Sequence, residues 1–280
     1  MSTPLHPDLD PTLFGDASAR EECFELRDRW RDLRTLPVGH PGKAVEFLHR
    51  QMNEEVQVME NAARDLHEFP DEEWEVRYWL ARQVADEARH AIAYRGAVER
   101  RGGHVGMHPV WAFQYRVLGR VHSLIGRLAV QNRTFEADGL DAVTHEIGAS
   151  RARGADDLVE QYEAQQADEV LHVRFANEYI RREVARRPRA VLEMTRALSL
   201  AARAFAQATE GGGRSNIPHG VASEERSLAG FTPDEIATAV RLAETRRREE
   251  SQAPAGVVPR DGDPLPRDRR AAERATMDTP

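Results

Sequence analysis

Two stretches of the sequence repeat the pattern Asp-Glu-x-x-His eighty-two residues apart, DEARH at 86–90 and DEVLH at 168–172. Acids are common in this chain, so a single Glu-x-x-His is expected by chance, and Glu46 with His49 supplies one. A preceding aspartate in both stretches makes a coincidence improbable. The repeat therefore predicts that the two stretches are halves of one site.

Helical periodicity runs through both motifs, and no segment shows the alternation typical of a β-strand. We expect an all-α fold, with helices at about 17–33, 43–67, 72–101, 111–147, 158–187, 189–208 and 232–250. The second to fifth of these helices make two hairpins joined by a longer connection. This is the outline of a four-helix bundle with one long crossover, followed by additional C-terminal helices.

The same pattern predicts the organisation of the chain into parts. The Pro- and Asp-rich start and the charged end do not have the composition of a core. We expect a loosely held arm with a short helix at 1–40, the bundle with its metal site at 41–188, a helical extension packing on the bundle at 189–250 and a disordered tail at 251–280.

The buried faces of two expected helices include acids of the repeated motif. The apolar stripe of the helix at 72–101 steps by three and four residues through Leu80, Val84, Glu87, Ala91, Tyr94 and Val98. His90 lies one turn beyond Glu87, and the stripe of the helix at 158–187 contains both Glu169 and His172. A carboxylate ion that faces a core is costly unless a positive charge meets it. The two motifs therefore predict bound cations.

The other two bundle helices each place one acid on the buried stripe. In the helix at 43–67 this acid is Glu55, and in the helix at 111–147 it is Glu136. Glu55 precedes Glu87 by 32 residues and Glu136 precedes Glu169 by 33, so each pair should meet at matching depth in its hairpin.

The extra Glu-x-x-His in the helix at 43–67 is expected to lie off the buried face. The apolar stripe of that helix runs through Val45 and Leu48 instead of Glu46 and His49. We therefore exclude this pair from the site.

The candidate metal ligands are Glu55, Glu87, His90, Glu136, Glu169 and His172. One Glu from each of two helices and a Glu-x-x-His from each of the other two is the ligand arrangement of dinuclear iron and manganese bundles. Oxygen ligands with one nitrogen per metal favour iron or manganese. The only cysteine, Cys23, excludes a thiolate zinc cluster. We predict two iron ions, with manganese or a mixed manganese–iron pair as the alternative, and the four glutamates as catalytic residues.

Two aspartates next to the ligands are predicted to orient the histidines. A metal-bound imidazole usually donates its remaining N–H to a carboxylate. Asp86 and Asp168 face sideways, where each can reach the histidine of the partner helix, and Arg89 can balance the charge of one of them.

These residues resemble those of a known superfamily. The chain is similar to ferritin-like proteins, DEARH resembles a segment of bacterial multicomponent monooxygenases, and the closest likeness is to a bacterial ferritin-like family of largely unassigned function. The segments that carry the resemblance, within about residues 43–236, are HEFPDE, DEARHAIAY, NRTFEADGLD, ADEVLHVRFANEYI and AGFTPDEI. The resemblance also places Tyr94 near the radical tyrosine of the metal-bearing subunit of ribonucleotide reductase, as a candidate redox-active residue.

The resemblance implies that the reduced centre reacts with dioxygen. We expect an oxidase or oxygenase that hydroxylates, desaturates or N-oxidises a small organic substrate, because the residues after the bundle can cover a pocket. Met52, Met59, Phe135 and Gln165 are candidates for lining this pocket. The alternatives are a ferroxidase or iron-handling protein, a manganese catalase-like protein, and a non-enzymatic helical module with a structural metal.

Charge and hydropathy limit the expected partners. The net charge of −8 predicts no binding to nucleic acid or to an anionic membrane surface. The N-terminus has no apolar signal core and no run approaches the ~18 residues that cross a bilayer, so we expect a cytoplasmic protein. An external electron donor is also expected, since no flavin or nicotinamide motif is present, and a homodimer is left open.

Overall fold

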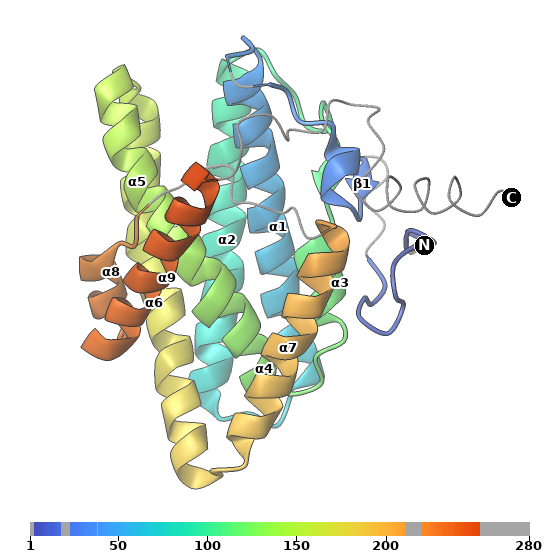
Figure 1. Ribbon diagram of the computed structural model, residues 1–280, viewed down its shortest axis with the longest axis vertical. Helices are drawn as coiled ribbons and strands as arrows, with labels where there is room; N and C mark the ends of the chain where they lie inside the picture. The colour runs from blue at the N-terminus through green and yellow to red at the C-terminus, as the bar shows by residue number, and fades with distance from the viewer. Residues whose placement is uncertain (1–2, 18–22, 38, 211–219, 253–280) are drawn as a thin grey trace, which may run out of the picture. The chain divides into compact units, whose positions relative to one another are not determined.

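Four long helices form the frame around the buried acids: α1 (Lys43–Glu68), α2 (Trp74–Arg100), α5 (Ala137–Arg153) and α6 (Asp156–Arg186). They lie side by side in a computed structural model that describes residues 3–17, 23–37, 39–210 and 220–252 (Figure 1). Helix α1 packs along α2, α5 packs along α6, and α2 meets α6. The predicted all-α class is confirmed. The chain divides into two compact units, Met1–Val240 and Arg241–Pro280, and the frame lies in the first.

The expected helix at 111–147 is wrong as a single element. This segment contains the strand β2 (Val110–Trp111) and the helices α3 (Phe113–Leu118), α4 (Leu124–Val130) and η2, a π-helix (Gln131–Glu136) that continues into α5. Ser123 starts a new helix because its side-chain oxygen accepts a hydrogen bond from the Gly126 N–H, as an N-cap does. Helix α5 then runs past residue 147 and ends at Gly154, whose φ of 67° suits glycine.

The N-terminal segment also differs from expectation. The helix expected at 17–33 is absent from the described residues 23–33, which form the strand β1 (Leu26–Arg27) and a short 3₁₀ helix η1 (Trp30–Leu33). β1 pairs in parallel with β2, so the expectation of no strand is wrong as well. Strand pairing is favoured here because the backbone N–H and C=O groups of β1 find hydrogen-bond partners in β2, within the long connection after α2.

The arm expected to be loosely held is anchored within its described residues, 3–17. Leu9, Leu13 and Phe14 are buried in an apolar cluster with residues of α3, α4 and the following helix α7 (Ala190–Ala208). The side chain of Arg116, also buried, donates hydrogen bonds to the carbonyl oxygens of residues 3, 4 and 15. A buried guanidinium requires such acceptors, so it ties the arm to α3.

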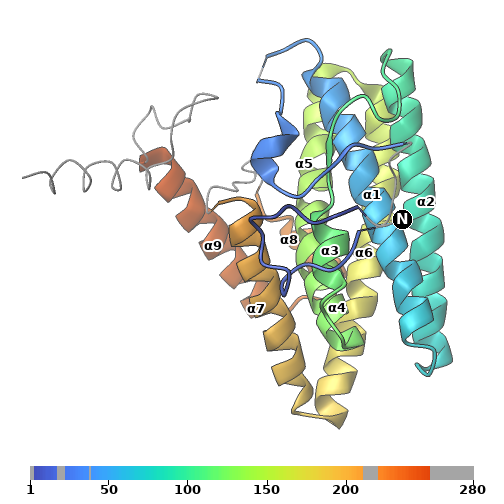
Figure 2. The ribbon, with the colours of Figure 1, turned by 90° about the vertical axis from the view of Figure 1, so that its right-hand side faces the viewer.

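Helix α7 covers α4 and α3 on one side of the frame (Figure 2). Its buried face is made of alanines, and a Cβ at Gly126 of α4 would lie only 2.9 Å from the Cβ of Ala197. Glycine at 126 therefore allows the two helices to approach closely. The short helix α8 (Ser223–Leu228) was not expected, whereas α9 (Pro233–Gln252) was. Residues 211–219, between the helices expected at 189–208 and 232–250, and residues 253–280 of the predicted tail lie outside the described residues.

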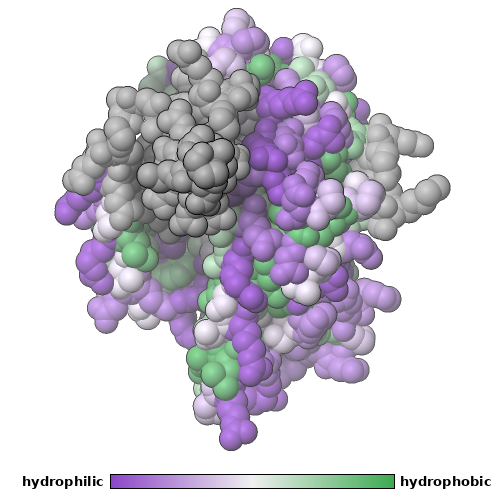
Figure 3. Space-filling model, turned by 45° about the vertical axis from the view of Figure 1, so that its right-hand side comes forward, coloured by the Kyte–Doolittle hydropathy of each residue, from purple (hydrophilic) through white to green (hydrophobic). Residues whose placement is uncertain are grey.

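The surface is mainly hydrophilic on the face shown in Figure 3, where hydrophobic residues form small groups among polar ones. Among the described residues, no helix combines the length and the apolar character needed to span a membrane.

Candidate metal centre

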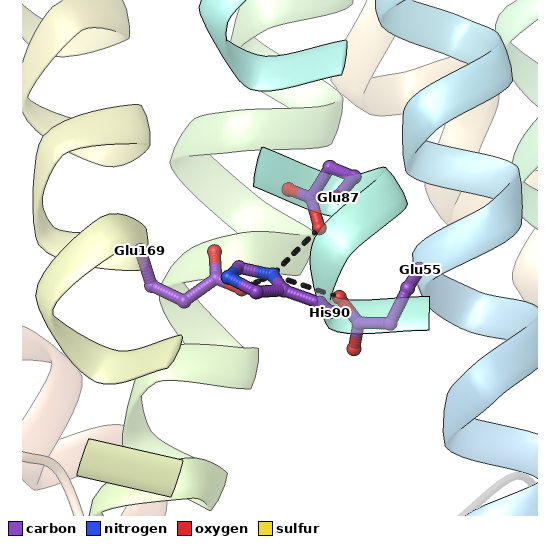
Figure 4. A group of neighbouring side chains, drawn as sticks. All are labelled: Glu55, Glu87, His90 and Glu169. Atoms are coloured by element: carbon purple, nitrogen blue, oxygen red, sulfur yellow. Dashed lines mark hydrogen bonds and ion pairs between the residues drawn. The ribbon is translucent and has the colours of Figure 1, made fainter. Parts of the chain in front are cut away.

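The six predicted ligand residues meet inside the four-helix frame. Glu55 comes from α1, Glu87 and His90 from α2, Glu136 from the end of η2, and Glu169 and His172 from α6. Figure 4 shows Glu55, Glu87, His90 and Glu169 converging from α1, α2 and α6. No residue of the six is more than 6 % exposed. Helical spacing thus brings residues from four distant segments to one depth of the core.

The ligand atoms form two overlapping groups of four residues. The first group is Glu55, Glu87, His90 and Glu169, and the second is Glu87, Glu136, Glu169 and His172. Within each group, one ligand atom from each residue lies within 4.8 Å of the others. Glu87 and Glu169 belong to both groups. The centre therefore offers two adjacent positions for a cation, and each position is surrounded by three carboxylates and one imidazole.

The Nδ1 atoms of both histidines point into the centre. His90 Nδ1 lies 3.1 Å from Glu87 Oε2 and 3.4 Å from Glu55 Oε2. His172 Nδ1 lies 3.1 Å from Glu87 Oε1 and 3.5 Å from Glu169 Oε2. Glu87 thus contacts one histidine with each of its two carboxylate oxygens, which is the geometry that a shared ligand needs.

The Nε2 atoms of the histidines point outward and meet the predicted aspartates across the helix pair. His90 on α2 lies 3.1 Å from Asp168 Oδ2 on α6, and His172 on α6 lies 3.2 Å from Asp86 Oδ2 on α2. Arg89 Nη2 lies 2.8 Å from an oxygen of each aspartate. A carboxylate at the outer nitrogen places the proton there and leaves the inner nitrogen free to bind a cation.

Three amide side chains donate hydrogen bonds to Glu55 and Glu136, the outer glutamates, which each belong to only one ligand group. The sequence had not indicated any of these amides as a partner of a ligand. Gln165 Nε2 donates to Glu55 Oε1 at 3.0 Å, and Gln83 Nε2 donates to Glu136 Oε1. Asn132 Nδ2 donates to Glu136 Oε2 at 3.1 Å. The sequence does carry a signal for the two glutamines, since the repeat extends to Gln-x-A-D-E-x-x-H at 83–90 and 165–172.

Glu136 reaches the centre from the last residue of the π-helix η2. On an α-helix, three successive steps of four residues rotate a side chain by roughly 120° away from its face. The buried positions Leu128, Asn132, Glu136 and Leu140 are separated by three such steps, and the wider π-helical turns keep them on one face. The unusual spacing is therefore a local signal for the π-helix.

The electrostatics of the centre divide the acids into two kinds. Burial, reinforced by neighbouring carboxylates, raises the pKa of Glu55 and of Glu136 well above the usual range. Burial also acts on Glu87, but contacts with His172 and His90 outweigh it and hold the pKa of Glu87 well below its usual range. Burial opposes the charge of His90, yet its contacts with Glu55 and Glu87 raise its pKa to about 11. Protons on the imidazoles thus balance carboxylate charge wherever a cation does not.

Two buried ligand atoms lack a hydrogen-bond partner among the described residues. These are Glu169 Oε2 and His172 Nδ1, which face each other at 3.5 Å. Buried polar atoms are rarely left unsatisfied. A cation between them would satisfy both atoms and would offset the carboxylate charge. The buried Glu and His residues can therefore hold a metal ion.

Tyr94 lies one helical turn after His90 and is buried. Its hydroxyl donates to Gln165 Oε1 at 2.9 Å, and the amide of Gln165 donates in turn to Glu55. Burial, and then the charge of Glu55, raises the pKa of Tyr94 well above the usual value, so the phenol stays protonated. Tyr94 is thus connected to the centre through one amide, while its redox role stays a prediction.

The excluded pair, Glu46 and His49, is correctly outside the centre but was wrongly expected to lie off a buried face. Glu46 is 1 % exposed and His49 is fully buried. The Glu46 carboxylate contacts Lys43 and Arg50 and accepts a hydrogen bond from the Leu36 N–H. The N-terminal segment covers this side of α1, which a helical stripe on α1 alone does not reveal.

Comparison with known proteins finds one family. The family described as "Protein of unknown function (DUF455)" matches residues 8–237. No curated protein and no solved structure matches the chain. The matched range includes all six residues of the candidate centre.

Proposed function

The chain belongs to the DUF455 family, and from this premise we propose that it is a ferritin-like oxidoreductase with a dinuclear metal centre. The proposed metals are two iron ions, with manganese or a mixed pair as the alternative. The proposed reaction is the oxidation of a small organic molecule by dioxygen, as a hydroxylation, a desaturation or an N-oxidation.

The sharing of Glu87 and Glu169 between the two ligand groups carries this proposal. In a mononuclear site all ligands bind the same ion, whereas here the two histidines belong to different ligand groups. A structural zinc site is usually a closed tetrahedral set of cysteines and histidines. Here two places share two carboxylates, and each place has one further carboxylate and one imidazole. Such oxygen-rich sets suit iron or manganese. They also match the ligands that helical bundles use for dinuclear centres.

The chain's own residues prepare this centre for oxidation chemistry. Asp86 and Asp168 hold the outer nitrogens of the histidines, and Gln83 and Gln165 hold the outer glutamates. Burial excludes bulk water from the ligand set. When bound, the metal pair would supply the electrons that reduce dioxygen.

The reaction needs electrons from outside the chain. Hydroxylation of a C–H bond by dioxygen inserts one oxygen atom, reduces the other to water and consumes two electrons and two protons. Cys23 is the only cysteine, so a thiol pair within the chain is not their source. We therefore propose an external electron donor as partner, together with dioxygen and a small-molecule substrate.

Metal loading and gas uptake test this proposal. Protein reconstituted anaerobically with ferrous iron should hold close to two ions per chain by elemental analysis, and it should consume dioxygen at an electrode once reduced. A chain that binds no iron or manganese contradicts the proposal. A loaded chain that consumes hydrogen peroxide but not dioxygen would instead be a catalase-like protein. Uptake that releases ferric iron without oxidising any organic molecule would indicate a ferroxidase.

A further inference from the structure

Helices α2 and α6 carry the repeat in antiparallel orientation, so an approximate two-fold relation exchanges residue n of α2 with residue n plus eighty-two of α6. The relation holds for the ligands and for their partners, since His90 with Asp168 mirrors His172 with Asp86. It also holds for an ion pair at each end, Arg100 with Asp157 and Arg182 with Glu75. A difference between the side chains at two related positions therefore distinguishes the two sides of the centre.

The side of the centre next to His90 is open. A cavity of about 300 Å³ lies between α2 and α6, and this size is sufficient for a small ligand. His90 and Gln165 form its inner end, and Ala93, Ala164 and Gln161 contribute to its walls. Because His90 and Gln165 both contact Glu55, the cavity leads from the surface to the first of the two metal places.

The related side, next to His172, has bulky side chains at the equivalent positions. Phe175 replaces Ala93, Arg82 replaces Ala164, and Trp79 replaces Gln161. The rings of Trp79 and Phe175 stack with centroids 6.1 Å apart, and the Arg82 guanidinium lies 5.3 Å from the Trp79 ring. Aromatic rings thus occupy the space that two alanines and one glutamine leave open at the other side.

We propose that the cavity beside His90 is the substrate site and that it binds a small alkyl amine. This inference rests on the proposed function and adds to it a substrate class and a single route of entry. The alkyl chain lies against Ala93 and Ala164 and directs the atom to be oxidised towards His90 and Glu55.

Charge at the cavity favours a cationic head group. Arg100 is paired with Asp157, and Arg89 is paired with both aspartates of the centre. Glu160, which also lines the cavity, makes no ion pair with the described part of the chain. Asp157 is shared by Arg100 and Arg101, and Glu160 is the one charged residue of the lining without an opposite partner among the described residues. Its carboxylate attracts an ammonium group.

A hydrogen-bond donor is also available at the cavity. The Nε2 atom of Gln161 is buried and has no partner among the described residues. A ligand that carries an acceptor beside its ammonium group would satisfy this donor.

Binding, measured apart from turnover, tests the inference. Hexylamine, hexanol and hexanoate would be titrated by calorimetry into the anaerobic, metal-loaded protein. We expect hexylamine to bind most tightly and hexanoate most weakly. Glu160→Gln should weaken hexylamine binding about threefold to fivefold, the size of an exposed ion pair, and should leave hexanol unchanged. The matched control Glu163→Gln, at an exposed glutamate paired with Arg151, should change neither.

Closing the cavity tests the route of entry. Ala93→Phe, and separately Gln161→Trp, copies the closed side and should abolish binding of hexylamine while metal content stays at the wild-type level. Ala85→Phe, on an exposed position of α2 outside the cavity, should bind hexylamine normally. Undiminished binding in both closed variants, or hexanoate binding as tight as that of hexylamine, would overturn the inference. Amine binding without dioxygen uptake would leave the site standing and contradict only the proposed function.

Discussion

Two buried regions of this protein contain the same Glu-x-x-His spacing and hold it in opposite electrostatic states. Burial, followed by the charges of His108 and Arg50, lowers the pKa of His49 to about 4. At the centre, contacts with carboxylates overcome burial and raise the pKa of His90 to about 11. Both histidines are at most 4 % exposed, so burial alone does not explain the difference.

The neighbours of each motif account for the contrast. Glu46 has cations on both sides, Lys43 and Arg50, and His49 Nε2 accepts a hydrogen bond from the Gly106 N–H. The charge of Glu46 is already balanced there, so its carboxylate does not require a metal ion. At the centre, four carboxylates face two imidazoles with no arginine or lysine among the ligands. The surplus of carboxylates, and not the motif, distinguishes the candidate metal centre from the region around Glu46 and His49.

The largest expected difference between the two regions is in metal content. Glu87→Ala and Glu169→Ala should each reduce bound iron to background, because each residue belongs to both ligand groups. Glu46→Ala should keep the wild-type content, since Arg50 retains hydrogen bonds to the carbonyl oxygens of Leu33 and Pro109 and the fold is held. Elemental analysis of reconstituted protein, with circular dichroism as a check of folding, measures this. Equal losses in all three variants would show that the regions do not differ in this way.

A smaller effect is expected from the partners of the outer histidine nitrogens. Asp86→Asn and Asp168→Asn should each weaken metal binding about ten- to a hundredfold, because the aspartate fixes the orientation of the imidazole. Competition with a chelator of known affinity measures the change. Asp157→Asn, which lies on the same helix as Asp168 but pairs only with arginines, is the control and should bind as the wild type does. Unchanged metal affinity in the first two variants would show that the aspartates do not contribute to metal binding.

The smallest expected effect is on stability at acid pH. The folded protein holds the pKa of His49 at about 4, below the ordinary 6.5, so the unfolded chain binds a proton more readily. The contribution of neutral His49 to the free energy of unfolding is therefore fully present above pH 6.5 and is lost as the pH falls towards 4. At about pH 5.5 the loss from His49 should be about 1.4 kcal/mol.

Denaturant unfolding of the metal-loaded protein at about pH 8 and pH 5.5 measures this loss. His49→Gln should reduce the pH dependence by that amount, whereas His67→Gln, at an exposed position of α1, should leave it unchanged. If the free energy of unfolding changed equally with pH in the wild type and in His49→Gln, protonation of His49 would not destabilise the folded protein.

The sequence predicted the fold best where helices are long and periodic. The helices expected at 43–67, 72–101 and 189–208 agree with α1, α2 and α7. It failed at the segment 111–147, where a serine cap and a π-helix interrupt the pattern, and at the N-terminal segment, where a parallel strand pair forms. The two failures have different physical causes. The serine cap and the π-helix are local features that apolar periodicity does not reveal, whereas β1 forms because pairing with the distant β2 outweighs local helical preference.

The buried stripes also predicted which acids meet in the core, because residues on one face of each helix point towards the same interior. The stripe separated Glu55 from neighbouring acids, the stripe and the spacing from Glu169 indicated Glu136, and the structure brings both to the centre. Gln83 and Asn132 were missed, since an amide on a buried face reads as ordinary core packing until its partner is known.

The sequence by itself determined the duplicated motif, the helical faces and the matching depth of the four glutamates, because these follow from residue spacing along each helix. Only the tertiary structure decided that Arg89 contacts both aspartates, what covers Glu46 and His49, and which side of the centre is open. These features depend on how α2, α6 and the N-terminal segment dock on one another. Docking is set by side-chain volume and charge across helices, which periodicity within one helix does not encode.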